Sequence, residues 1–218
     1  MSEIKDTTKR IYLVRHGETE ANRLEYVPNK LEPLNDTGLL QAQALAGRLE
    51  NLSFDKIVVS DFLRSQQTAE PIAKLKKLTP EIVSHFGEML EPTSLHGVFD
   101  TDERVQEYRK NRNANVDEPS WRFEDGETFT DVLTRVHLSK RYLEEQESEN
   151  VLVVAHGFFL QMFGATILLD ADEATKLWFH ALTTLRMSNT GICLLTYDNE
   201  SKRWRIVLWN DHAHFAEN

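Results

Sequence analysis

Short apolar runs alternate along most of this chain with longer segments whose apolar positions recur every three or four residues. Runs of the first kind are typical of buried strands, and segments of the second kind are typical of helices that pack on a sheet. The alternation predicts a three-layer α/β fold, with a mainly parallel sheet, helices on both of its faces and an antiparallel hairpin at its edge. The predicted strands cover residues 11–14, 56–60, 81–84, 151–154, 191–197 and 203–209, and the predicted helices cover residues 37–49, 65–75, 102–111, 128–147, 158–169 and 171–179.

Local signals mark the ends of two of these elements. Thr128 and Asp131 have the spacing of a capping box, which predicts that a long helix begins beside them. The polar residues 198–201 separate the last two apolar runs and predict the turn of the hairpin.

The apolar segment 151–169 is nearly as long as a membrane-spanning helix. Polar and small residues, including His156, Gly157 and Gln161, interrupt it. A strand that is buried on both faces also forms an unbroken apolar run. We therefore expect a strand, a sharp turn and a buried helix here, and no membrane span.

The regular pattern loosens between residues 96 and 127, over a stretch that is charged and longer than an ordinary loop. We expect residues 1–218 to form a single domain, with residues 96–127 inserted as a helical cap over the carboxyl ends of the strands. A solvated surface excursion is the alternative, and the helix at 102–111 is expected to be exposed. The candidates in the cap for contact with a second anionic group of the substrate are Arg104, Tyr108, Arg109, Arg112, Trp121 and Arg122.

Composition narrows the choice of partners and compartment. The net charge of −10 disfavours a general attraction to nucleic acid or to anionic lipid. The single cysteine, Cys193, excludes an internal disulfide and suits a reducing compartment. The polar segment 1–10 lacks the apolar core of a signal peptide. We therefore expect a cytoplasmic protein with neither nucleic acid nor membrane as a partner.

Two histidines stand where predicted strands end, each directly before a glycine. They are His16 and His156. The carboxyl ends of parallel strands meet at one edge of an open α/β sheet, where such sheets bind ligands, so we expect both imidazoles to face one pocket. The guanidinium groups of Arg15 and Arg64 offer paired donors and positive charge to a phosphoryl group in that pocket.

Four blocks of sequence carry a family resemblance. In order and spacing they resemble the histidine phosphatase superfamily, also called the phosphoglycerate mutase-like family, over nearly the whole chain from about residue 11. The resemblance implies phosphoryl transfer through a phosphohistidine. The blocks are Arg-His-Gly-Glu-Thr at 15–19 followed by Asn22, Leu-Asn-Asp-Thr-Gly-Leu-Leu-Gln-Ala at 34–42, Ser-Asp-Phe-Leu-Arg-Ser at 60–65 and Ala-His-Gly at 155–157.

The resemblance assigns His16 the role of nucleophile. Its attacking nitrogen needs the lone pair of a neutral imidazole, whose unperturbed pKa is about 6.5, so the other ring nitrogen must hold its proton against a backbone carbonyl. The resemblance also implies that Arg15, Asn22, Arg64 and His156 contact the phosphoryl group, with further positive charge if His156 is protonated. Alternatives are a turn role for Asn22 and a surface position for Arg64.

Two glutamates are candidates for the general acid. Family members place a glutamate just after the third strand, and the segment 88–97 contains Glu88 and Glu91. The Leu90-Glu91 step resembles the family pattern better, so Glu91 is preferred and Glu88 is the alternative. The carboxyl group must carry a proton when the leaving oxygen departs, and it could then act as a base on the attacking water.

Departures from the family pattern bear on the reaction. Asp61 stands where the family commonly has proline. Phosphoglycerate mutases usually continue after the acid with an arginine, a tyrosine and a glycine that grip the phosphoglycerate, whereas Glu91 is followed by Pro92, Thr93 and Ser94. This second departure favours a phosphatase over a mutase, whereas Asp61 could cap the following turn or lower the affinity for phosphate.

The leading hypothesis is a metal-independent phosphomonoesterase, without any cofactor, that acts on a small phosphorylated metabolite. A phosphoglycerate mutase is the second hypothesis. A metallohydrolase built on His16 and His156 is a third, and His212 and His214 form a further, weaker metal motif. A phospho-ligand binding module without turnover is the non-enzymatic alternative. The physiological substrate and the oligomeric state stay open.

Overall fold

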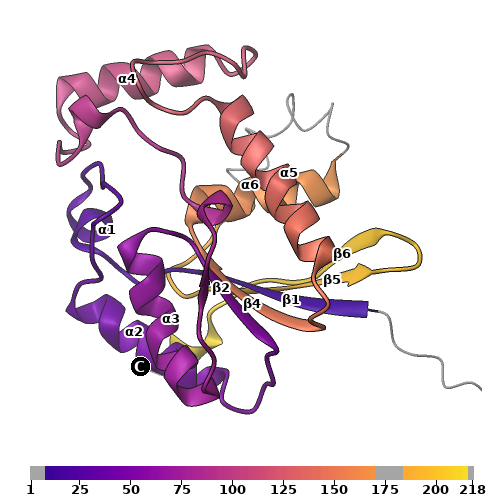
Figure 1. Ribbon diagram of the computed structural model, residues 1–218. Helices are drawn as coiled ribbons and strands as arrows, with labels where there is room; N and C mark the ends of the chain where they lie inside the picture. Colours follow the sequence, from indigo (N-terminus) through magenta and orange to yellow (C-terminus); the bar gives the residue numbers. More distant parts are fainter. Residues whose placement is uncertain (1–7, 170–183, 216–218) are drawn as a thin grey trace, which may run out of the picture.

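One mixed sheet of six strands organises the computed structural model, which describes residues 8–169 and 184–215 (Figure 1). The strand order is β3-β2-β4-β1-β5-β6. Strands β1 to β4 pair in parallel, and β5 and β6 add an antiparallel hairpin to β1. The predicted sheet is therefore confirmed. The strands are β1 (Thr8–Arg15), β2 (Lys56–Val59), β3 (Glu81–Ile82), β4 (Asn150–Ala155), β5 (Ile192–Asp198) and β6 (Arg203–Asp211).

Five of the predicted helices are present with ends shifted by a few residues, and the predicted helix at 171–179 lies outside the described residues. Thr128 and Asp131 form the predicted capping box at the start of α5. The sequence pattern did not predict the short helix α1 or the single 3₁₀ turns. The helices are α1 (Glu20–Leu24), α2 (Asp36–Arg48), α3 (Leu63–Lys76), α4 (Glu103–Ala114), α5 (Phe129–Glu145) and α6 (Gly157–Leu168), and the 3₁₀ turns are η1 (Ser84–Phe86), η2 (Thr93–Leu95) and η3 (Ala213–Phe215).

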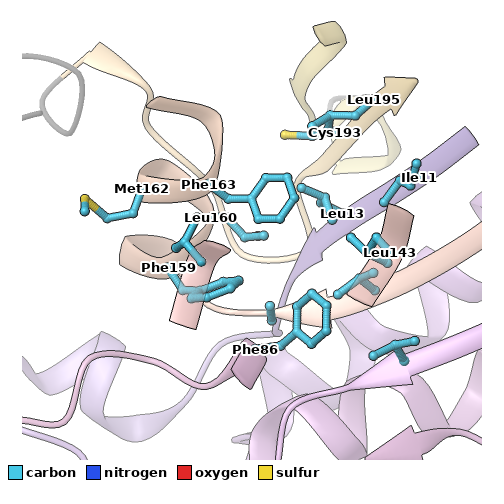
Figure 2. Close-up of a cluster of buried hydrophobic side chains, with 14 of the residues drawn as sticks. Ile11, Leu13, Phe86, Leu143, Phe159, Leu160, Met162, Phe163, Cys193 and Leu195 are labelled. Carbon is cyan, nitrogen blue, oxygen red and sulfur yellow. The ribbon is translucent and has the colours of Figure 1, made fainter. Parts of the chain in front are cut away.

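Two hydrophobic cores lie on opposite faces of the sheet because neighbouring residues of a strand point to opposite sides. Leu13 belongs to the core between the sheet and helices α5 and α6. The next residue, Val14, belongs to the core that α2 and α3 cover. Figure 2 shows side chains of β1, α5, α6 and β5 meeting in the first of these cores.

The segment 151–169 folds as the predicted strand, turn and helix. It comprises nearly all of β4 and the buried helix α6. No helix among the described residues is long and apolar enough to cross a membrane.

The 96–127 segment contains α4, which stands apart from the sheet near the beginning of α5 (Figure 1). The expectation that this helix is exposed is wrong for one of its sides. Val105 and Tyr108 are buried and form a small third core with Val27 and Leu95. The helix sequence hides this side, because only two apolar residues in twelve provide it.

The register of β1 on β4 positions the two strand-end histidines. These strands are parallel neighbours, and Arg15 pairs with Ala155 at their carboxyl ends. The next residue of each strand is a histidine, so His16 and His156 leave the sheet side by side.

Candidate active site

The imidazoles of His16 and His156 face each other in the interior. Their ring centroids lie 5.2 Å apart, with an angle of 57° between the ring planes. His16 is 3% exposed and His156 is fully buried. The prediction that two histidines distant in sequence converge is confirmed.

Hydrogen bonds assign the protonation of His16. Its Nδ1 lies 2.7 Å from the carbonyl oxygen of Gly17, which can only accept, so Nδ1 carries the proton. The guanidinium of Arg64 donates from Nε to Nε2 of His16 across 3.2 Å. The lone pair is therefore on Nε2, with the backbone carbonyl as the partner that the nucleophilic role requires.

His156 contacts two serines through Nε2, at 2.7 Å from Oγ of Ser60 and 3.2 Å from Oγ of Ser65. Oγ of Ser60 accepts a hydrogen bond from the backbone nitrogen of Phe62, which leaves its hydroxyl proton for His156. The pattern favours the tautomer with the proton on Nδ1. That nitrogen is buried and has no hydrogen-bond partner in the described part of the chain.

Burial keeps both imidazoles neutral. Desolvation lowers the pKa of His16 well below its ordinary value, and the charges of Arg64 and Arg15 lower it further. The pKa of His156 is also lowered well below its ordinary value, first by burial and then by Arg64. His156 therefore offers a neutral N–H donor at pH 7, so the additional positive charge considered in the sequence analysis is absent from the free protein.

Arg15 and Arg64 bring the positive charge beside the two rings. Arg15 donates from one terminal nitrogen to the carbonyl of Met187 at 2.7 Å, while its Nε is buried without an acceptor among the described residues. Arg64 is 2% exposed and stacks over the ring of Phe62. Burial lowers the pKa of Arg64 to about 10, so the guanidinium stays charged at pH 7.

Glycines allow the backbone to approach closely around the site. A Cβ at Gly157 would lie 3.2 Å from Nε of Arg15, so glycine lets the guanidinium pack on the start of α6. A Cβ at Gly38 would lie 2.0 Å from the carbonyl oxygen of Glu18. The side chain of Asn35 donates to Glu18 and accepts from the backbone nitrogen of Gly38. The Leu-Asn-Asp-Thr-Gly block therefore holds the loop that follows His16.

The two candidate acids have different surroundings. The carboxylate of Glu88 accepts hydrogen bonds from the backbone nitrogens of Phe158 and Phe159, at 3.1 and 3.0 Å, at the start of α6. Its charge raises the pKa values of Arg15 and Arg64 against the effect of burial. Glu88 therefore lies in the electrostatic field of both guanidinium groups.

The carboxylate of Glu91 points toward the 96–127 segment. It pairs with Arg112, with Oε1 at 3.3 Å from the guanidinium, and its Oε2 is buried without a hydrogen-bond partner among the described residues. Both Glu88 and Glu91 line a pocket of about 270 Å³ that also includes Arg64.

One protein-family model matches most of this chain. The model described as the histidine phosphatase superfamily (branch 1) matches residues 11–212. The chain belongs to the histidine phosphatase superfamily.

Individual relatives of this superfamily carry both mutase and phosphatase names. The chain is similar to the protein named "Probable phosphoglycerate mutase GpmB" of Yersinia pestis (strain Pestoides F), with 29% identity over 209 residues that cover 94% of each chain. Among solved structures it is similar to the alpha-ribazole phosphatase from Shigella flexneri, with a TM-score of 0.77, 25% identity, and coverage of 93% of this chain and 96% of that chain. It is also similar to a mycobacterial glucosyl-3-phosphoglycerate phosphatase, with a TM-score of 0.77, 25% identity and coverage of 93% and 99%.

Asn22 completes the capping box at the start of α1. Its Oδ1 accepts from the backbone nitrogen of Thr19 and from Nδ2 of Asn189. Asn189 also donates to the carbonyl oxygen of His16 at 3.0 Å. The sequence analysis missed Asn189, which precedes β5 and carries no motif. The turn role of Asn22 is therefore present in the structure, and its NH₂ group remains the candidate donor to a phosphate.

Three of the arginines named in the 96–127 segment do not line the pocket and pair with carboxylates elsewhere. Arg104 pairs with Asp102, and Arg109 makes two short contacts with Asp100. Among the six residues named in the sequence analysis, Arg112 alone lines the pocket that contains Glu88 and Glu91. The remaining basic residue, Arg122, pairs with Asp131, and Tyr108 and Trp121 line a smaller adjoining hollow.

Asp61, which stands where the family commonly has proline, forms an ion pair with Lys30 at 2.8 Å.

Within residues 8–169 and 184–215, no group of three or more histidine, cysteine, aspartate or glutamate side chains is placed to hold a metal ion.

Proposed function

We propose that this member of the superfamily hydrolyses phosphate monoesters of small metabolites through a phosphohistidine on His16. The supporting observation is a pair of buried nitrogens, Nε of Arg15 and Nδ1 of His156, that lack acceptors in the described part of the chain. An unsatisfied buried donor costs about 1 to 3 kcal/mol, which an anion between the two groups would recover. The charged guanidinium of Arg64 beside them favours a phosphoryl group.

The first step forms a bond between phosphorus and Nε2 of His16 while the bond from phosphorus to the ester oxygen breaks. Arg15, Arg64 and His156 bind the phosphoryl oxygens through both stages, and the amide of Asn22 belongs to the same proposal. The departing oxygen takes a proton from a carboxylic acid. A substrate that binds as its monoanion brings this proton with it, because the second pKa of a phosphate monoester is about 6.

We assign the acid role to Glu88 rather than to Glu91, the residue that the sequence favours. Glu88 is close enough to Arg15 and Arg64 to raise the pKa of both guanidinium groups, whereas Glu91 pairs with Arg112. In the second step Glu88 takes a proton from a water that attacks the phosphohistidine. The bond between phosphorus and Nε2 breaks, and inorganic phosphate leaves.

Phosphate transfer to water is favoured over return to a phosphoglycerate. With Glu88 as the acid, the next residues are Met89, Leu90 and Glu91, and none of them is the arginine, tyrosine or glycine of a mutase. The two phosphatases among the similar structures agree with this choice. A cytoplasmic location is a further part of the proposal and rests on the single cysteine.

The deciding experiment measures phosphate release from p-nitrophenyl phosphate by purified protein in excess chelator. We expect turnover with chelator, an acid-labile phosphoenzyme, and a loss of at least about 10³-fold in His16→Ala, because the nucleophile is removed. His137→Ala changes an exposed histidine on α5, outside the site, and should retain activity. Undiminished turnover in His16→Ala, or transfer of phosphate only to a phosphoglycerate, would contradict the proposal.

A further inference from the structure

The pocket beside the phosphoryl site extends toward the 96–127 segment. It has a volume of about 270 Å³ and shares Arg64 and Glu88 with the site. Glu91 and Arg112 also line it. Small-molecule sites have volumes of roughly 300 to 1,000 Å³, so this pocket suits the alcohol part of a small ester rather than a protein chain.

Carboxylates accompany the cations that line this pocket beside Arg64. Lys30 pairs with Asp61 at 2.8 Å, and Arg112 pairs with Glu91 at 3.3 Å. His96, the other basic side chain of the lining, is close enough to Asp125 to contribute to lowering the pKa of that carboxyl. Arg64 bonds to His16 and to the carbonyl of Asn29, and the proposed function uses its remaining donors for the phosphoryl group. A second anionic group on the substrate would therefore meet paired charges, and it would approach the carboxylate of Glu91.

Glu91 presents a partly exposed carboxylate to the pocket. Its side chain is 21% exposed and lines the pocket, with Oε1 paired to Arg112, whereas Oε2 is buried and the Tyr108 phenol lies within hydrogen-bonding reach of the carboxylate. Tyr108 packs against the Glu91–Arg112 pair, because the guanidinium of Arg112 lies 5.4 Å from the centre of the Tyr108 ring. Burial, and then the charge of Glu91, raises the pKa of the Tyr108 phenol, so no second anion forms there.

Most of the remaining wall is apolar. Phe62 and Phe158 line the pocket together with Met89 and Leu90, and Asn29 and His96 are the other polar side chains of the lining. Such walls pack well against carbon atoms, and the few polar groups among them then determine orientation.

We infer that the Glu91–Arg112 pair selects the alcohol part of the ester, and that the substrates are monophosphates of small neutral sugars or polyols. Glu91 accepts a hydrogen bond from one substrate hydroxyl, and Arg112 donates to another. A carboxylate or second phosphate at the same place is disfavoured, because it would lie against Glu91. The inference rests on the proposed function and adds the substrate class to it.

Glycerol 3-phosphate and 3-phosphoglycerate form a matched pair of test substrates. They differ at one end, where the first has a hydroxymethyl group and the second a carboxylate. We expect the unmodified protein to have a kcat/KM at least about tenfold higher for glycerol 3-phosphate, since like charges in a desolvated site repel. A preference for 3-phosphoglycerate would overturn the inference.

Two substitutions should move this ratio in opposite directions. Glu91→Gln keeps the shape of the side chain and releases Arg112, so the preference should fall about tenfold. Arg112→Met leaves Glu91 without its partner, so the preference should rise. Any other combination of changes in the two ratios would overturn the inference. An equal loss of kcat/KM for both substrates would also overturn it, and this is the result expected if Glu91 is the general acid.

Controls separate this inference from the folding of α4 and from the proposed function. Arg109 lies on α4, as Arg112 does, but outside the pocket, and it pairs with Asp100. Asp100→Asn breaks this ion pair and should leave the kcat/KM ratio of the two substrates unchanged. Circular dichroism checks that each variant is folded. Turnover of p-nitrophenyl phosphate, with its loss in His16→Ala, tests the proposed function by itself. If that turnover persists and the ratios do not respond, only the substrate assignment fails.

Discussion

Arg64 donates a hydrogen bond from Nε to Nε2 of His16, across 3.2 Å in the interior of the protein. A cation therefore contacts the nitrogen that we propose as the nucleophile. The contact orients the ring and opposes its protonation. In the proposed reaction the same guanidinium turns its remaining donors to the phosphoryl oxygens.

Replacing Arg64 with lysine should impair catalysis although the charge is kept. An ammonium group cannot reproduce the planar fork that contacts both the ring and a phosphoryl group. We expect kcat/KM for p-nitrophenyl phosphate to fall by roughly 10²- to 10³-fold, the range seen when one positioned donor is lost. Arg48→Lys, which changes a half-exposed arginine paired with Asp211, provides the control. Equal rates for Arg64→Lys and the parent protein would contradict the phosphate-binding role.

Leaving-group chemistry should distinguish Glu88 from Glu91 as the acid. Glu88→Gln should reduce hydrolysis of an alkyl ester such as glycerol 3-phosphate by roughly 10²- to 10⁴-fold, because the alkoxide cannot leave without a proton. The same variant should lose less activity on p-nitrophenyl phosphate, whose leaving group needs little protonation. Steady-state kinetics with both esters gives the comparison. If Glu91→Gln shows this selective loss instead, the sequence-based preference for Glu91 is correct.

Stability should decline with acid because buried histidines resist protonation. The folded pKa of His156 lies well below its ordinary value, which is that of the unfolded chain. As the pH falls below about 6.5, the unfolded state therefore takes up a proton that the folded state does not, and the free energy of unfolding falls by up to about 1.4 kcal/mol per pH unit for each such histidine.

This dependence can be assigned by substitution. His156→Gln should reduce the slope of unfolding free energy against pH by up to about 1.4 kcal/mol per unit below about pH 6. Urea unfolding at a series of pH values measures the slope. His212→Gln, at an exposed position, should behave as the parent protein does. An unchanged slope in His156→Gln would show that its imidazole protonates freely in the folded state.

Two glycines of α2 provide a matched test of close packing near the site. A Cβ at Gly38 would lie 2.0 Å from the backbone oxygen of Glu18, so Gly38→Ala must displace the loop that follows His16. We expect a loss of about 1 to 3 kcal/mol in unfolding free energy, together with a loss of activity. A Cβ at Gly47 meets nothing within 4 Å, so Gly47→Ala should stabilise the helix by about 0.5 to 1 kcal/mol. Thermal unfolding of both variants measures the two changes in stability. A change of the same sign in Gly38→Ala and Gly47→Ala would contradict this explanation.

The sequence by itself determined the sheet and the placement of a histidine after each of two of its strands. Strands of a parallel sheet carry apolar runs, so residues 11–14 of β1 and 151–154 of β4 were recognisable, and the histidine after each strand was placed by its direction. The capping box at Thr128 could also be predicted, because its contacts lie within four residues. These features depend on local periodicity and on short-range hydrogen bonds.

Tertiary structure alone decided the contacts of the irregular segments. Glu88 and Glu91 lie three residues apart in a stretch without periodicity, and their environments differ because Glu88 meets the backbone of α6 whereas Glu91 meets Arg112. The contact of Asn189 with the backbone of His16 joins positions far apart in the chain. Nothing in the composition of these segments specifies such long-range partners, because the packing of the whole chain determines which side chains meet.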